Sequence, residues 1–138
     1  MNTDLIDIKI RAVEGGVTAA AGFKAAGIHA GFRKNPERLD YALVVPDKPC
    51  PGAGVFTTNR FCAAPVQVSR ANLGGADKGY GIVAGVSINS GNANAATGET
   101  GLACARETCN IASQVIGCEP QQILVASTGV IGQILPID

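Results

Sequence analysis

The feature that most constrains the fold is a change of hydrophobic period along the C-terminal half of the chain. Residues 81–88 (GIVAGVSI) form a nearly continuous apolar run that is too short for a typical helix, and a strand covered on both faces has this pattern. Residues 98–116 instead place apolar side chains every three or four positions, which predicts an amphipathic helix. A second buried strand is predicted at residues 122–127 (QILVAS), after Pro120. The order strand, helix, strand predicts a layered α/β fold.

The predicted helix has recognisable ends. Thr97 is a suitable N-cap, and Glu99 lies where a negative charge interacts favourably with the helix dipole. Gly117 suits the left-handed residue that commonly follows a helix. The apolar stripe of this helix consists of Leu102, Ala105, Cys109, Ala112 and Ile116.

The N-terminal half predicts strands rather than helices. Three short segments rich in β-branched or aromatic residues are bounded by Pro, Gly or Asn: residues 41–45, 55–58 and 65–69. A turn at 46–48 (PDK) separates the first two, and residues 27–32 form a weaker strand pattern because of their glycines. This half of the chain therefore predicts an antiparallel meander. With no visible linker or repeat, we expect residues 1–138 to form a single domain.

Charge and hydropathy exclude several classes of function. Eleven Lys and Arg balance eleven Asp and Glu, so the formal net charge is zero and nucleic acid or an anionic membrane is not an expected partner. No apolar run reaches the length of about 18 residues that a membrane helix needs. The N-terminus lacks a secretory signal, which indicates a cytosolic chain. A neutral chain is poorly protected against self-association, so an obligate partner chain is plausible.

The five cysteines do not form a metal-binding pattern. None are spaced as CxxC, and the only histidine, His29, is far from most of them in sequence. We therefore expect no metal site and interpret the cysteines as reduced thiols that pack as small apolar residues. The cysteines are Cys50, Cys62, Cys104, Cys109 and Cys118.

Two polar loops follow predicted strands. In residues 89–94 (NSGNAN) three side-chain amides crowd one turn; they either shape a tight strand-to-helix crossing or contact a substrate. In residues 127–132 (STGVIG) a Gly amide beside a Thr hydroxyl could supply two donors to an oxyanion, although the same letters also occur in ordinary turns. Neither loop has a phosphate-binding glycine motif. No nucleophile constellation accompanies them, and His29 is interpreted as a hydrogen-bonded structural residue.

Four segments together resemble the start of the ornithine acetyltransferase family, also called the bifunctional glutamate N-acetyltransferase family. They follow one another in the order and with the spacing of the family and cover nearly the whole chain. Small departures occur at Ala20, Ala21 and Ala96. The four segments are GGVTAAAGFKAAGIHAGFRK (15–34), AGVFTTNRFCAAPVQVSR (53–70), INSGNANAATGETG (88–101) and ILVASTGVIGQILP (123–136).

The resemblance implies an activity and a site. Members of the family transfer acetyl from N-acetylornithine to glutamate in arginine biosynthesis, and some also take it from acetyl-CoA; no resident cofactor is implied. The precursor cleaves itself into two chains of an α2β2-type assembly, and the N-terminal Thr of the second chain is the nucleophile, with its amine as base. The oxyanion-hole positions of the family match the Thr128 hydroxyl and the Gly129 backbone N–H. The implied fold is a layered α/β sandwich of mixed sheets with covering helices, as in N-terminal-nucleophile enzymes.

The nucleophile that the family requires is not among these residues. We therefore expect a truncated N-terminal (α-chain) portion that is inactive alone, and the uncapped apolar ending ILPI (134–137) agrees with this expectation. Two alternatives stay open at this point. One is a related N-terminal-nucleophile amidohydrolase, which hydrolysis rather than transfer to glutamate would reveal. The other is a non-catalytic scaffold module.

Overall fold

The computed structural model describes residues 10–75 and 77–137 as two helices, six strands and two short 3-10 turns. A single domain spanning 1–138 stays a prediction, since residues 1–9, 76 and 138 lie outside the described part. The helices are α1 (Ala64–Asn72) and α2 (Gly98–Ile116), the 3-10 turns are η1 (Gly16–Ala19) and η2 (Pro120–Gln122), and the strands are β1 (Phe23–Ile28), β2 (Tyr41–Pro46), β3 (Cys50–Ala53), β4 (Tyr80–Val83), β5 (Gly85–Asn92) and β6 (Ile123–Val130).

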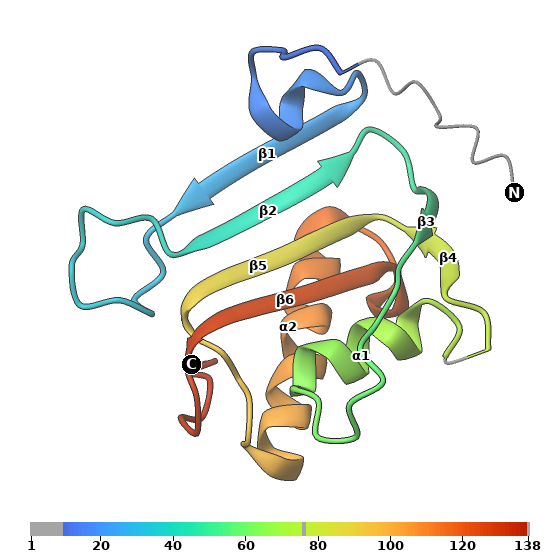
Figure 1. The fold of residues 1–138 in the computed structure, drawn as a ribbon. Coiled ribbons are helices and arrows are strands. Elements are labelled where there is room, and N and C mark those ends of the chain that lie inside the picture. Colours follow the sequence, from blue (N-terminus) through green and yellow to red (C-terminus); the bar gives the residue numbers. More distant parts are fainter. Residues whose placement is uncertain (1–9, 76, 138) are drawn as a thin grey trace, which may run out of the picture.

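Four strands form one mixed sheet in the order β1-β2-β5-β6. The first two pairings are antiparallel, whereas β5 and β6 run parallel and are connected through α2 (Figure 1). β3 and β4 form a separate antiparallel ribbon. The predicted meander is therefore wrong, because β2 pairs with β5 rather than with the next strand along the chain. The predicted layered α/β architecture, a mixed sheet with covering helices, is confirmed.

The core lies between β6 and the two helices. Ile123 and Val125 point from β6 to the side on which α1 and α2 pack together. On the opposite face of the sheet, partners such as Val86 and Leu124 are only half-buried. Helices thus cover one face of the sheet at β5 and β6 and leave the other face open. The buried core cluster consists of Ala64, Val68, Ala105, Cys109, Ala112, Ile123 and Val125.

Helix α1 seals the outer edge of β6. The Ser69 hydroxyl donates to the Val125 carbonyl at 2.8 Å and accepts the Val125 N–H at 2.9 Å, and the Asn72 amide donates to the Ile123 carbonyl at 2.7 Å. The predicted strand at 65–69 is therefore wrong. Pro65 lies in the first turn of the helix, where its missing N–H costs nothing, and Ala64 and Val68 bury one face four residues apart.

The predicted strand at 55–58 is also wrong. β3 ends at Ala53 because β4 begins at its partner, Tyr80, and the last bond beyond the ribbon joins the Gly54 N–H to the Gly79 carbonyl. Within residues 10–75 and 77–137, the residues that follow pair with no strand. Instead, the Arg70 guanidinium binds the Thr57 carbonyl at 2.6 Å.

Two further strand boundaries differ from the prediction. The apolar run 81–88 divides between β4 and β5 at Ala84, a buried residue whose N–H donates to Gln122. A continuous apolar run cannot reveal such a bend, because the apolar letters continue from β4 into β5 without a break. Near the N-terminus, β1 covers Phe23–Ile28 rather than 27–32, because the chain leaves the edge of β2 after Ile28 to wrap around Asp40.

Helix α2 has the predicted bounds. Gly117 adopts a left-handed conformation (φ 80°) and donates to the Ser113 carbonyl, which confirms the predicted C-terminus. Thr97 occupies the N-cap position, but its hydroxyl donates to the Asn94 side chain rather than capping the helix. Neither described helix is long and apolar enough to span a bilayer.

Candidate active site at the ends of β5 and β6

The two polar loops singled out in the sequence lie side by side. Parallel pairing places Ser90 opposite Thr128 and Gly91 opposite Gly129, with a bulge after Gly91. Beyond the bulge, the Ala93 N–H donates to the Val130 carbonyl at 2.9 Å. Both loops therefore belong to one corner of the fold, at the carboxyl ends of two adjacent strands.

Gly129 and Gly91 touch through their backbones. A Cβ atom on Gly129 (φ 137°) would overlap the Gly91 carbonyl carbon and lie 2.5 Å from the Asn92 nitrogen. Only glycine allows this approach, and the left-handed φ angle also favours glycine. The contact fixes the peptide that carries the Gly129 N–H, one of the two predicted oxyanion donors.

The three asparagines of residues 89–94 are buried, and their amides hold the backbone. Asn89 donates to the Asn92 carbonyl at 2.8 Å, and Asn92 donates to the Gln133 and Ile134 carbonyls. Asn94 donates to the Gly101 carbonyl and adopts a left-handed φ of 45°. Of the two readings of this loop, the structural role is the one that the hydrogen bonds support.

Thr128 is exposed at the end of β6. Strand alternation places it on the same face as Leu124 and Ala126, which is the face that α1 and α2 leave open. Its hydroxyl forms no hydrogen bond with residues 10–75 or 77–137. The hydroxyl is therefore available to a ligand that approaches from the open face.

The other reactive side chains do not join this corner. All five cysteines are free thiols. Burial raises the pKa of the Cys109 thiol to about 11, against the smaller opposing effect of a hydrogen bond with the Asn72 amide. His29 is hydrogen-bonded as predicted, with Nδ1 3.1 Å from the Arg38 carbonyl oxygen. Within the described ranges, no three His, Cys, Asp or Glu residues are grouped to hold a metal ion.

Sequence reasoning missed a buried carboxylate next to the corner. Asp40 is 3% exposed and accepts hydrogen bonds from the backbone N–H groups of Ala30 (2.6 Å) and Arg33 (2.7 Å). Burial favours the neutral carboxyl group, but these two N–H groups, His29 and the Phe32 N–H outweigh it. The pKa of Asp40 therefore lies below its ordinary value of 3.8. A single Asp before an apolar strand carries no signal that would have identified it.

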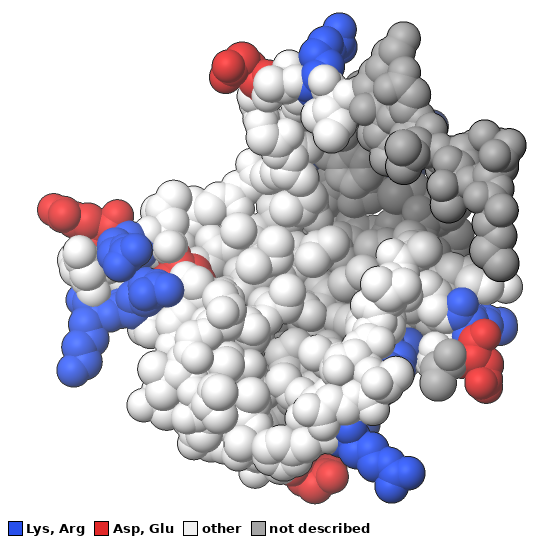
Figure 2. All heavy atoms as spheres, viewed as in Figure 1, with Lys and Arg blue, Asp and Glu red and all other residues white. Residues whose placement is uncertain are grey.

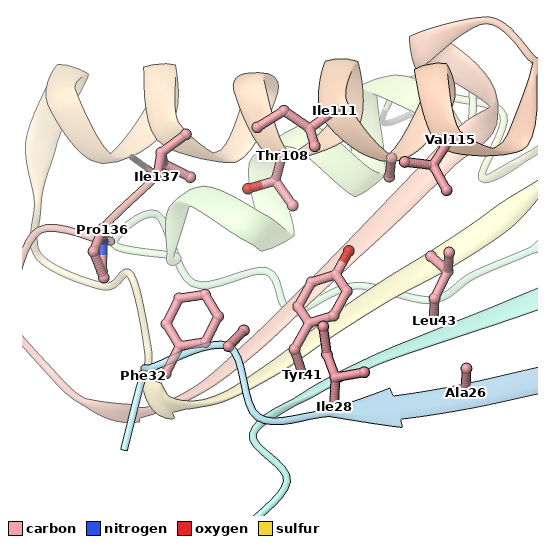
Figure 3. A pocket seen from close by; sticks show the side chains of 12 residues that line it. Ala26, Ile28, Phe32, Tyr41, Leu43, Thr108, Ile111, Val115, Pro136 and Ile137 are labelled. Atoms are coloured by element: carbon pink, nitrogen blue, oxygen red, sulfur yellow. The ribbon is translucent and has the colours of Figure 1, made fainter. Parts of the chain in front are cut away.

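An apolar cavity of about 430 Å³ opens beside α2. Ile28, Tyr41 and Leu43 line it from the sheet, facing Thr108, Ile111 and Val115 on the helix (Figure 3). Phe32, Pro136 and Ile137 line one end of the cavity. The lining of the cavity is mainly apolar and suits contact with further apolar groups.

Charged side chains lie mostly at the periphery of the face seen in Figure 2, whose centre is largely uncharged.

Solved structures with this arrangement define the class. Arginine biosynthesis bifunctional protein ArgJ from Bacillus halodurans matches with a TM-score of 0.80 and 36% identity over 89% of this chain and 61% of the other. Ornithine acetyltransferase from Mycobacterium tuberculosis, solved in complex with ornithine, matches with a TM-score of 0.76 and 39% identity over 88% of this chain and 63% of the other. The fold is therefore that of the ornithine acetyltransferases.

The sequence relatives agree. The ArgJ family profile matches residues 24–138, and the chain belongs to the ArgJ family. It is 46% identical to the arginine biosynthesis bifunctional protein ArgJ of Dehalococcoides mccartyi over 91% of its own length. The chain is also 50% identical to the arginine biosynthesis bifunctional protein ArgJ of Bifidobacterium longum, over 88% of this chain. In both comparisons the chain spans about 30% of the relative's length.

Proposed function

We propose that this chain is the oxyanion-hole part of an enzyme that transfers acetyl from N-acetylornithine to glutamate. In this proposal the Thr128 hydroxyl and the Gly129 backbone N–H are the two donors. The observation that carries it is the contact between Gly129 and Gly91, which holds a peptide N–H beside an unengaged, exposed hydroxyl. The names of the relatives and the ornithine complex of a structural neighbour support the choice of substrates.

The two donors suit the chemistry of acyl transfer. Attack on the acetyl carbonyl places negative charge on its oxygen, both when the acetyl-enzyme forms and when glutamate accepts the group. Donors that are already fixed in place stabilise this charge without reorganising during the reaction. Acetyl-CoA, as an alternative acetyl donor, would pass through the same oxyanion, and the proposal needs no resident cofactor.

The nucleophile comes from outside the 138 residues in this proposal. A second (β) chain with an N-terminal Thr supplies it, its hydroxyl attacking the carbonyl while its amine takes the proton. The exposed Thr128 on the face not covered by helices is the place where such a chain would meet this one. An α2β2-type assembly in the cytoplasm follows from the resemblance to the family.

Complementation tests the proposal. Acetyl transfer from N-acetylornithine to glutamate is measured with this chain alone, and then with the remaining segment of the protein supplied as a separate chain. Transfer only after complementation is the expected result. Transfer by the chain alone would place a nucleophile within these residues and overturn the mechanism. No transfer in a folded, assembled complex would favour a non-catalytic role.

A further inference from the structure

The carboxylate of Asp40 organises the loop that connects β1 to β2. Its side chain is fully buried and accepts the N–H groups of Ala30 and Arg33, with His29 Nδ1 3.2 Å away. Two short bonds to one carboxylate are charge-assisted and stronger than neutral ones. The loop therefore closes around a charge that lies inside the protein.

The closed loop is in close contact with the end of β5. A Cβ atom on Gly91 would lie 2.8 Å from the Phe32 carbonyl oxygen, so the loop backbone rests on the bare Cα of Gly91. Two hydrogen bonds fasten it there. Arg33 Nε donates to the Ser90 hydroxyl at 3.1 Å, and the Ser90 N–H donates to the Asp40 carbonyl at 2.8 Å.

Gly91 in turn touches Gly129, as described above. A continuous path of contacts thus runs from the Asp40 carboxylate through the Phe32 carbonyl and Gly91 to Gly129. Each contact in this path involves main-chain atoms, which cannot rotate away as a side chain can. A displacement of the loop is therefore transmitted to the peptide that carries the Gly129 N–H.

We propose that Asp40 is a positioning residue for the oxyanion hole, acting through the loop 30–33 and Gly91 on the direction of the Gly129 N–H. This inference rests on the proposed function of Thr128 and Gly129. The inference can be told apart from a purely structural role of Asp40. With a purely structural role, loss of the carboxylate would lower stability but leave the turnover of the folded protein unchanged.

The kinetic test uses the complemented enzyme. Asp40→Asn exchanges one acceptor oxygen for a donor that faces a backbone N–H. It is expected to lower kcat by up to about 10²-fold while KM for N-acetylornithine changes little, because misplaced catalytic groups lose rate rather than binding. Asp47→Asn is the matched control, since Asp47 is exposed and pairs only with Lys24 among the described residues. The control is expected to keep the kcat of the parent.

Two single variants separate this inference from the proposed function. An unchanged kcat of Asp40→Asn in the folded, complemented enzyme would overturn the inference. An unchanged kcat of Thr128→Ala would instead overturn the proposed function.

A spectroscopic test needs no turnover. In the complemented protein, with this chain ¹⁵N-glycine-labelled, Asp40→Asn is expected to shift the amide resonance of Gly129, whereas that of Gly117, at the far end of α2, stays in place. If Asp40→Asn does not fold, Ser90→Ala carries the same prediction, because it removes the acceptor of Arg33 Nε between the loop and β5. A shift at Gly91 without one at Gly129 would contradict the proposed path.

Discussion

At the scale of single residues, Gly129 combines two constraints, a left-handed φ angle and a backbone neighbour in the space of a Cβ atom. Gly129→Ala is therefore expected to destabilise the protein by more than the roughly 1–3 kcal/mol of a strained φ angle alone. Gly132→Ala is the control, because Gly132 also has a positive φ (82°) but open space around it. Urea unfolding measures the free energy of unfolding of both variants. Equal losses of this free energy would contradict a backbone overlap at Gly129.

The Thr128 hydroxyl is expected to act in turnover rather than in binding. Thr128→Ala in the complemented enzyme should lower kcat by about 10²–10³-fold with KM nearly unchanged, because the lost hydrogen bond strengthens only as the oxyanion forms. Steady-state kinetics check this. Ser127→Ala, one residue earlier in β6, is the control and should change kcat by less than about threefold. Equal turnover of Thr128→Ala and the parent would exclude the assigned role.

The lowered pKa of Asp40 predicts a contribution to acid stability. Because the carboxyl pKa is depressed in the folded chain, its stabilising effect is fully present above its ordinary value of 3.8 and is lost as pH falls through the folded value. Unfolding free energy measured from about pH 6 to about pH 2 should fall less steeply for Asp40→Asn than for the parent. Parallel curves would show that the ionised form is not favoured by folding.

At the scale of elements, the seal between α1 and β6 depends on one hydroxyl. Ser69 satisfies both the N–H and the carbonyl of Val125 on the outer edge of the sheet, away from water. Ser69→Ala should cost about 1–3 kcal/mol, since two buried backbone groups lose their partner. Ser113→Ala is a matched buried control, because its hydroxyl bonds only within α2. If thermal unfolding shows equal losses of stability for the two variants, the Ser69 hydroxyl does not have this role at the edge of β6.

The elements also show what the sequence could predict. Helix α2 was predicted with its bounds because apolar period, acidic first turn and terminal glycine all agree. α1 was mistaken for a strand because Val66 and Val68 alternate, whereas its helical state depends on packing against the edge of β6. Local pattern cannot report such a tertiary contact.

For the candidate site, too, the sequence predicts some residues and misses others. Thr128 and Gly129 were identified through family resemblance, with a loop chemistry that was weak by itself. Their proximity to residues 89–94 required the parallel pairing of β5 and β6. Asp40 was missed because its partners are backbone N–H groups, which every sequence contains.

At the scale of the whole molecule, apolar surface is open on both sides of the sheet. The cavity beside α2 and the half-buried Val86 and Leu124 face outward, and the chain spans about 30% of the length of its relatives. The chain alone is therefore expected to be oligomeric or poorly soluble, and co-expression with the remaining segment should relieve this. Analytical ultracentrifugation checks the state in solution. A monodisperse monomer with a cooperative melt would contradict the expectation.

The parallel pairing of β5 and β6 also bears on biosynthesis. The chain must complete α2 before Gly91 can meet Gly129, so a nascent polypeptide lacks the corner where these two glycines touch until β6 has left the ribosome. A partner that recognised this corner could therefore bind only after that point in translation.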